Sequence, residues 1–167
     1  MLKPGIVGLK LNQLMQLPQG DISHTFPIAR QMGPPEHISK LLNFPMPEDK
    51  VSQLIKMALR DSKELGVLSQ ISVAEITTYM QNVLLRDTDQ MSMASALEVR
   101  VPFLDYTLVE YVIGINDNFK NPVYPKKLLV ESLGDLLPAG IVHRKKMGFS
   151  FPWEKWMRNE LKDFCEE

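Results

Sequence analysis

The sequence predicts an all-α protein. Apolar residues recur at spacings of three and four positions in several stretches, and prolines and capping residues separate these stretches. No stretch shows the sustained alternation with period two that indicates a half-buried strand. The 167 residues are 44% hydrophobic and 23% charged, an ordinary globular balance in a chain long enough to bury a real core.

The N-terminal part predicts short helices separated by proline-rich turns. Residues 1–16 carry a weak helical pattern of apolar residues that contains two glycines. Six prolines follow between Pro18 and Pro47. Because proline lacks an amide N–H and restricts the residue before it, we expect turns and one brief helix near residues 36–42.

After Pro47, two acidic residues suit the positive end of a helix dipole and predict a new helix. Gly66 is expected to stop this helix. Its apolar face comprises Val51, Leu54, Ile55 and Ala58.

The middle of the chain predicts two more helices. Residues 72–75, Ser-Val-Ala-Glu, form a capping box, which predicts a helix that starts there and runs to about Asp87. Asp105 is predicted to cap the next helix. The buried stripe of that helix comprises Leu108, Val109, Val112 and Ile113.

Proline also marks the last two predicted helices. Pro125 occupies a first-turn position of one helix, which Pro138 closes. Pro152 opens the other helix. Its single apolar face comprises Trp153, Trp156, Met157, Leu161 and Phe164.

The overall charge excludes some classes of partner. A net charge of −1 provides no field that would recruit nucleic acid or an anionic membrane, and no apolar run is long enough to span a bilayer. The only cysteine, Cys165, excludes an intramolecular disulfide and favours a reducing compartment. We therefore expect a cytoplasmic protein with no nucleic-acid and no membrane partner. The three histidines are too dispersed for a metal site.

Two stretches contain more than a helical bundle requires: "DQMSMASALEVRVPFLD", residues 89–105, and "HRKKMGFSFPWEKW", residues 143–156. Their order and spacing resemble the C-terminal part of the synthetase domain of glutamine-dependent asparagine synthetases. Gln90 departs from the resemblance, because the family usually has Arg or Lys there. The principal matches are Asp89, Met91, Ser92, Met93, Glu98, Arg100, Pro102, Asp105, Lys127, Pro138, Arg144, Lys146, Gly148, Pro152 and Trp156.

The resemblance implies the helical C-terminal portion of an adenine-nucleotide α-hydrolase-like synthetase domain, of the ATP-pyrophosphatase type. The family's serine- and glycine-rich pyrophosphate loop has no counterpart here, since no two of the nine glycines are adjacent. The glutaminase domain with its N-terminal cysteine has none either. We therefore expect a fragment, with residues 71–167 as the asparagine-synthetase-like region. Residues 1–70 form a helical, proline-rich segment without assignment.

By this resemblance, Lys146 corresponds to the family's catalytic lysine. A fixed ammonium there would stabilise the negative charge that builds up on phosphates and on a tetrahedral oxyanion. Arg100, Glu98, Arg144 and Gly148 are expected to support the substrate or phosphate side. Scaffolding of the loop by a Glu98–Arg100 pair is the alternative to direct chemistry for these two residues.

The resemblance implies ATP-dependent adenylation of the aspartate side-chain carboxylate and its amidation with glutamine-derived ammonia. ATP and Mg²⁺ would act in the whole enzyme, and we expect none bound by this chain alone, which is predicted inactive in isolation. Expected partners are the rest of the synthetase domain and a glutaminase domain, and uncovered apolar faces favour a homo-oligomer. The alternatives are a non-catalytic helical module that binds a partner, and a piece of a β-lactam-forming or peptide-cyclising synthetase.

Overall fold

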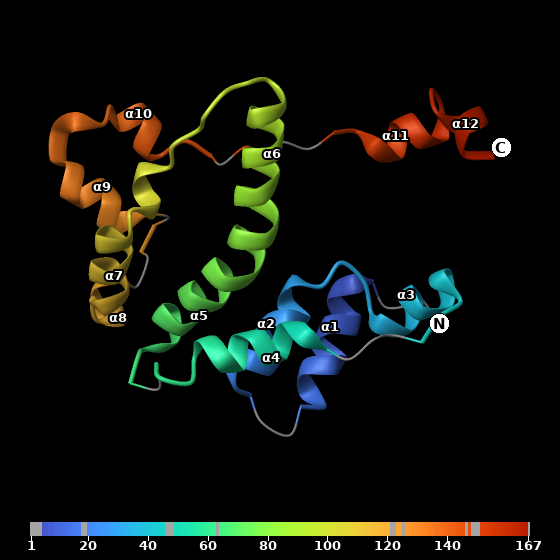
Figure 1. Ribbon diagram of the computed structural model, residues 1–167, viewed down its shortest axis with the longest axis horizontal. Coiled ribbons are helices and arrows are strands. Elements are labelled where there is room, and N and C mark those ends of the chain that lie inside the picture. Colours follow the sequence, from blue (N-terminus) through green and yellow to red (C-terminus); the bar gives the residue numbers. More distant parts are fainter. Residues whose placement is uncertain are drawn as a thin grey trace. The chain divides into compact units, whose positions relative to one another are not determined.

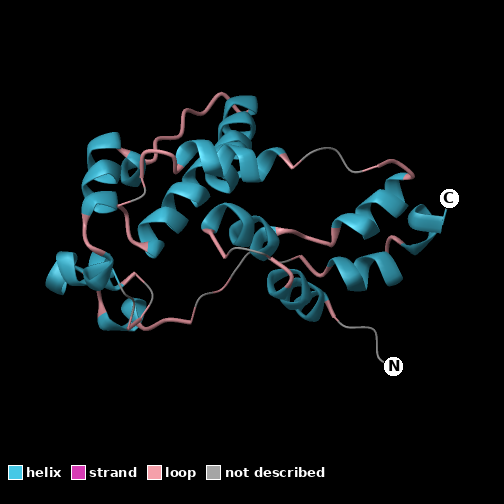
Figure 2. Cartoon of the chain, turned by 90° about the horizontal axis from the view of Figure 1, so that it is seen from below, coloured by secondary structure: helices cyan, strands magenta, loops and turns pink. Residues whose placement is uncertain are grey.

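The computed structural model describes residues 5–17, 20–45, 49–62, 64–120, 123–124, 126–145, 147 and 151–166. Over these residues every regular element is a helix, as the sequence predicts, and no strand occurs (Figures 1 and 2). No helix in these ranges is both long enough and apolar enough to cross a membrane. The chain divides into two compact units, residues 1–123 and 124–167.

The first unit contains the longer helices. In chain order they are α1 (Ile6–Met15), α2 (Ile22–Arg30), α3 (Pro35–Leu42), α4 (Lys50–Ala58), α5 (Val67–Glu75), η1 (Ile76–Leu85), α6 (Arg86–Ala94), η2 (Pro102–Leu104), α7 (Tyr106–Gly114) and α8 (Asp117–Lys120). Helix α2 packs against α1, α4 and α5, and α5 packs against α7 and α8 (Figure 1).

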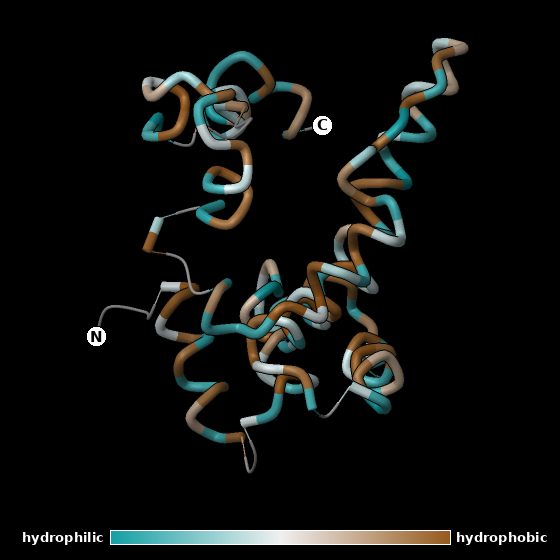
Figure 3. The backbone as a smooth tube through the Cα atoms, turned by 90° about the vertical axis from the view of Figure 1, so that its left-hand side faces the viewer, coloured by the Kyte–Doolittle hydropathy of each residue, from teal (hydrophilic) through white to brown (hydrophobic). Residues whose placement is uncertain are grey.

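The core of this unit is small. Phe26 of α2, Ile55 of α4 and Ala74 of α5 are buried together, and Ile22 and Leu59 pack against them. Ile55 is 0% exposed, whereas its neighbour Leu54 on the predicted apolar face is 49% exposed. Figure 3 shows hydrophobic and hydrophilic residues interspersed along the helices, and many of the hydrophobic ones lie at the surface.

Helix α2 is a correction to the sequence prediction, which placed only one brief helix in the proline-rich segment. That brief helix exists as α3, but α2 precedes it. Asp21 caps α2 by accepting from the His24 backbone N–H at 3.1 Å and from the Ser23 hydroxyl at 2.6 Å. Pro27 lies inside α2 and removes one hydrogen bond, and the burial of Phe26 offsets that loss.

Two predicted helix boundaries are wrong. Helix α4 ends at Ala58, and Gly66 is the N-cap of α5 rather than the stop of α4. The capping box at residues 72–75 does not start a helix, because these residues form the last turn of α5. The Ser72 hydroxyl there donates to the Leu68 carbonyl at 2.9 Å, a bond that is compatible with a helix interior.

The helix that begins at Val67 continues beyond the predicted end near Asp87. It passes through η1, a π-helix, and ends with α6 at Ala94. Within η1, the Asn82 side-chain amide donates to the carbonyls of Thr77 at 3.1 Å and Thr78 at 2.9 Å. These bonds give partners to carbonyls whose backbone pairing a wider helix changes.

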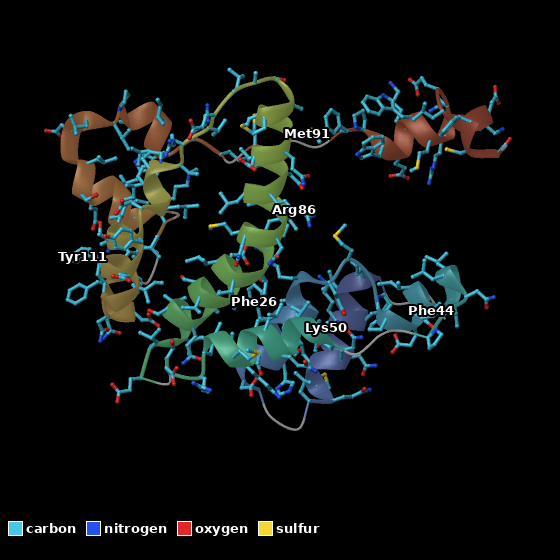
Figure 4. The ribbon with its side chains drawn as sticks, in the orientation of Figure 1. Phe26, Phe44, Lys50, Arg86, Met91 and Tyr111 are labelled. Atoms are coloured by element: carbon cyan, nitrogen blue, oxygen red, sulfur yellow. The ribbon has the colours of Figure 1, made fainter. Side chains whose placement is uncertain are left out.

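Helix α7 begins as predicted but is less buried than predicted. Asp105 is its N-cap, and Val109 and Ile113 are half-buried. Leu108 and Val112, which complete the predicted stripe, are exposed, so the expectation that the whole stripe is buried is wrong. Tyr111 of α7 and Met91 of α6, labelled in Figure 4, are also exposed.

The second unit contains short helices: α9 (Lys127–Leu133), η3 (Gly134–Leu136), α10 (Ala139–Val142), α11 (Trp153–Arg158) and α12 (Lys162–Glu166). Pro138 and Pro152 are the N-caps of α10 and α11, and Pro125 lies outside the described residues. The helix predicted after Pro152 is two helices, because Asn159 leaves the helical conformation at φ −125° and ψ −83°.

Candidate functional site

The first candidate segment begins where α6 ends. The Leu97 N–H bonds the Ser92 carbonyl at 2.9 Å and the Ala96 N–H bonds the Met93 carbonyl at 3.0 Å, which is the Schellman pattern. Ala96 adopts the left-handed conformation at φ +56°, a position that glycine usually occupies. The chain therefore turns sharply out of α6 at a strained residue, just before Glu98.

Glu98 and Arg100 then form an ion pair, with an Arg100 nitrogen 2.5 Å from a Glu98 carboxylate oxygen. The spacing of two predicts such a pair, and the pair forms, but Val101 before Pro102 has φ −121° and ψ 81° and so falls short of the extended conformation that the proline predicts. Both side chains are highly exposed, Arg100 at 83% and Glu98 at 71%. Because exposed pairs contribute only about 0–1 kcal/mol, this pair alone does not fix the loop. The remaining guanidinium donors of Arg100 face solvent and are accessible to an anionic ligand.

Asp105 closes this segment. Its carboxylate accepts from the backbone N–H groups of Thr107 at 3.0 Å and Leu108 at 3.3 Å, and also from the Thr107 hydroxyl. The Thr107 hydroxyl and then the Leu108 N–H hold the pKa of Asp105 below its usual range. Its role as a helix cap is confirmed, and the cap occupies the carboxylate oxygen that accepts these bonds.

The second candidate segment lies in the other unit. His143 follows α10, and the Arg144 N–H bonds the Ile141 carbonyl at 3.3 Å. The side chains of Arg144 and Lys145 are exposed. Lys146 and Gly148 lie outside the described residues, so the predicted catalytic lysine has no described geometry. Glu98 and Arg100 are thus the only two candidates that the described residues bring together.

Aromatic rings support the ends of the second segment. The ring centroid of Phe151 lies 5.7 Å from that of Trp153 and 5.8 Å from that of Trp156, so Phe151 anchors this segment to α11. At the other end, His143 meets Tyr124 edge-on at 6.4 Å. Tyr124 is not among the predicted site residues, because an isolated tyrosine between two prolines carries no sequence signal.

The described residues do not fit a nucleotide–metal site. Among them, no group of three or more His, Cys, Asp or Glu side chains could hold a metal ion. The full sequence also has no adjacent glycines to bring a backbone close to phosphates. A pocket of about 350 Å³ lies among α1, α2 and α4, lined by Gln13, His24, Gln31, Asp49 and others, and none of the three described candidates, Glu98, Arg100 and Arg144, lines it.

Comparison with known proteins gives one consistent result. The family described as asparagine synthase matches residues 10–167. Asparagine synthetase (glutamine-hydrolyzing) 1 of Bacillus subtilis is 29% identical over 126 residues, which are 75% of this chain and 20% of that protein. Asparagine synthetase (glutamine-hydrolyzing) 3 of the same organism is 42% identical over 78 residues, 46% of this chain and 12% of that protein. No solved structure matches the chain significantly.

Proposed function

This chain belongs to the asparagine synthase family, and from that membership we propose that it supplies the C-terminal helical portion of a glutamine-hydrolysing asparagine synthetase. The complete enzyme would adenylate the side-chain carboxylate of aspartate and amidate it with glutamine-derived ammonia. The observation that carries the proposal is the family match over residues 10–167, which includes both motif segments. The chain spans a fifth or less of the length of the two relatives described above.

In the complete enzyme, this chain would act together with parts that lie outside it. ATP and Mg²⁺ would be held by other parts of the synthetase, since the described residues do not fit them. The partners would be the remainder of the synthetase domain and a glutaminase domain, in the cytoplasm. Apolar residues on α7 and α11, such as Tyr111 and Trp153, are exposed, which supports burial of these surfaces by the partners or by a second copy of the chain in a homo-oligomer.

Within this chain, we assign Lys146 as the catalytic residue. Attack of ammonia on an activated carboxylate places negative charge on the carbonyl oxygen, and a fixed ammonium stabilises that charge. Arg100 is proposed as a contact to the anionic substrate side, with Glu98 orienting its guanidinium through the ion pair. Arg144 and Gly148 are proposed to support the second segment, Gly148 by allowing the chain to approach a ligand closely.

The experiment is a graft. The segment of B. subtilis asparagine synthetase 1 that aligns with this chain is replaced by the corresponding residues of this chain, and asparagine formation is measured with Lys146→Ala and with the matched neighbour Lys145→Ala. We expect Lys146→Ala to lower kcat by a factor of about 100 or more, as loss of a single charge-stabilising donor does. Lys145→Ala should leave kcat within about twofold, because charged residues in a basic run are usually solvated. Equal rates for the two variants would remove the assignment of Lys146.

Two other readings make different predictions. A related β-lactam-forming or peptide-cyclising synthetase would show turnover in the graft only with another carboxylate substrate. A non-catalytic module that binds a partner would tolerate Lys146→Ala in every assay. The sequence identity to two asparagine synthetases favours a role in asparagine formation over both of these alternatives.

A further inference from the structure

Helix α5 is capped by an aspartate that lies 49 residues further along the chain than Leu68 in its first turn. The carboxylate of Asp117, at the start of α8, accepts from the backbone N–H of Leu68 at 2.7 Å and from that of Ser69 at 3.2 Å. The Ser69 hydroxyl donates to the same carboxylate at 2.7 Å. An N-terminal cap normally comes from the residue just before the helix, but here that residue is Gly66, which has no side chain to offer.

A second aspartate in the chain shows the ordinary arrangement with the same chemistry. Asp49 accepts from the backbone N–H groups of Val51 at 3.0 Å and Ser52 at 3.1 Å, and from the Ser52 hydroxyl at 2.5 Å. The partners of Asp49 are two and three residues away, whereas those of Asp117 are 48 and 49 residues away. The Asp117 cap therefore joins two distant parts of the chain, while the Asp49 cap serves only its own helix.

Two further residues close this contact. Lys120 donates to the Ser69 hydroxyl at 2.7 Å and to the Ile113 carbonyl, at the end of α7, at 2.8 Å. Ser69 is only 1% exposed, so its hydroxyl depends on these partners. A Cβ atom at Gly66 would lie 2.1 Å from an Asp117 carboxylate oxygen, so the cap requires glycine there. We call Gly66, Ser69, Asp117 and Lys120 the α5 anchor.

The α5 anchor lies at the far end of α7, the helix that follows the first candidate segment. That segment leaves α6, passes Glu98 and Arg100, and enters α7, which continues to α8 (Figure 1). Helix α7 contacts α5 and the adjoining η2, and α8 contacts α5. The ion pair between Glu98 and Arg100 is too exposed to fix the segment from within. Helix α6 fixes the position where the segment begins, and helix α7 fixes the position where it ends. The latter position depends on the contacts that hold α7.

We propose that the α5 anchor is a positioning device for the Glu98–Arg100 segment: Asp117, Ser69 and Lys120 hold α7 and α8 on α5 and thereby set where Arg100 is presented. Its importance for catalysis depends on the proposed function, whereas the positioning itself does not. The anchor residues touch no reacting group and act only through the placement of α7. Gly66 contributes by leaving room for the carboxylate.

The test measures the placement of α7 directly in the full 167-residue chain. Cys165, exposed and the only cysteine, is changed to Ser, and spin labels are attached at Gln90→Cys on α6 and Glu110→Cys on α7, both exposed positions. The distance distribution between the labels is recorded for this background, for Asp117→Asn, and for the matched control Asp49→Asn. Asparagine keeps the size of aspartate, but at position 117 it places an amide N–H₂ opposite a backbone donor, because both oxygens of Asp117 accept from backbone N–H groups. At position 49 a single oxygen accepts from both backbone N–H groups, so asparagine can keep the cap there.

We expect Asp117→Asn to broaden the distance distribution and to lower the population at its main distance, while Asp49→Asn leaves the distribution unchanged. Hydrogen exchange at the amides of Leu68 and Ser69 should become about five- to tenfold faster in Asp117→Asn but not in Asp49→Asn, the usual effect of losing a helix cap. Gly66→Ala, which keeps the aspartate but displaces its carboxylate, should reproduce both changes. An unchanged distribution in Asp117→Asn, or equal broadening in both aspartate variants, would overturn the proposal. Failure of the unsubstituted graft to form asparagine would instead count against the proposed function alone.

Discussion

Arg30 should join three helices of the first unit, and its replacement gives a sharp test of the packing. Its guanidinium Nε donates to the Glu75 carboxylate at 3.0 Å, and a second nitrogen pairs with the other carboxylate oxygen. The guanidinium carbon also lies 5.0 Å from the ring centroid of Tyr79 in η1 and 5.9 Å from that of Phe26 in its own helix. One side chain of α2 thus contacts the last residue of α5 and the first turn of η1.

The magnitude follows from the exposure of these groups. Arg30 is 49% exposed and Glu75 25%, so solvent screens the ion pair and limits it to roughly 0.2–1 kcal/mol. The ring of Tyr79, well within the range for a cation–π contact, adds about 0.5–1 kcal/mol, and Phe26 lies at the edge of that range. Arg30→Ala should therefore lower the free energy of unfolding by about 1–2 kcal/mol. Arg30→Lys should recover only part of this, since an ammonium is not a planar fork.

The assay is urea unfolding followed by circular dichroism, in a double-mutant cycle with Glu75→Gln. The coupling energy between Arg30 and Glu75 should be a few tenths of a kcal/mol or more and should shrink at high salt. The reasoning would be refuted if Arg30→Lys restored all the stability that Arg30→Ala loses and if the cycle showed no coupling to Glu75. Neither the planar guanidinium nor the ion pair would then contribute.

Three further outcomes follow from the same structure. Ile55→Ala should cost about 2–5 kcal/mol of unfolding free energy because Ile55 is fully buried, whereas the half-exposed Leu54→Ala should cost roughly 1 kcal/mol; equal values in urea titrations would contradict the core assignment. Ala96→Gly should stabilise the chain by about 0.5–1 kcal/mol by relieving a left-handed alanine, and a lowered thermal midpoint would argue against that strain. Burial acts to raise the pKa of Asp49, but hydrogen bonds from Ser52 and Val51 outweigh it, and the folded pKa is lowered. The stability that this carboxylate contributes is thus present above the ordinary aspartate pKa of about 3.9 and is lost as the pH falls through the lower folded pKa. Asp49→Asn should therefore reduce the loss of unfolding free energy between pH 6 and pH 3. An identical pH profile of stability in the variant would disprove the linkage.

Local sequence signals predict the helical class and several caps correctly. Asp105 caps α7 because the carboxylate reaches N–H groups two and three residues ahead, which is a purely local geometry. The brief helix α3 and the helix start at Pro152 are local in the same sense, whereas Pro138, predicted to close a helix, is the N-cap of the unpredicted α10. The Glu98–Arg100 pair also follows from a local spacing of two residues.

The errors arise where tertiary contacts override local rules. Helix α2 forms through Pro27 because burial of Phe26 and the Asp21 cap offset one lost hydrogen bond. The capping box at Ser72 is bypassed because Asp117, a residue far along the chain, caps α5 several residues earlier. No local pattern identifies a cap that comes from 49 residues away. The predicted stripe of α7 is only half-buried because one side of the helix faces α5 and the other faces solvent.

The most direct measurement is asparagine formation by the graft of this chain into B. subtilis asparagine synthetase 1, with the isolated 167-residue chain assayed beside it. Aspartate, ATP, Mg²⁺ and glutamine are supplied to both, and asparagine and AMP are quantified. We predict that the graft releases asparagine and AMP in equal amounts and that the isolated chain releases neither. A folded graft that forms no asparagine, while the parent enzyme does so under the same conditions, would contradict the assignment of this chain to the synthetase.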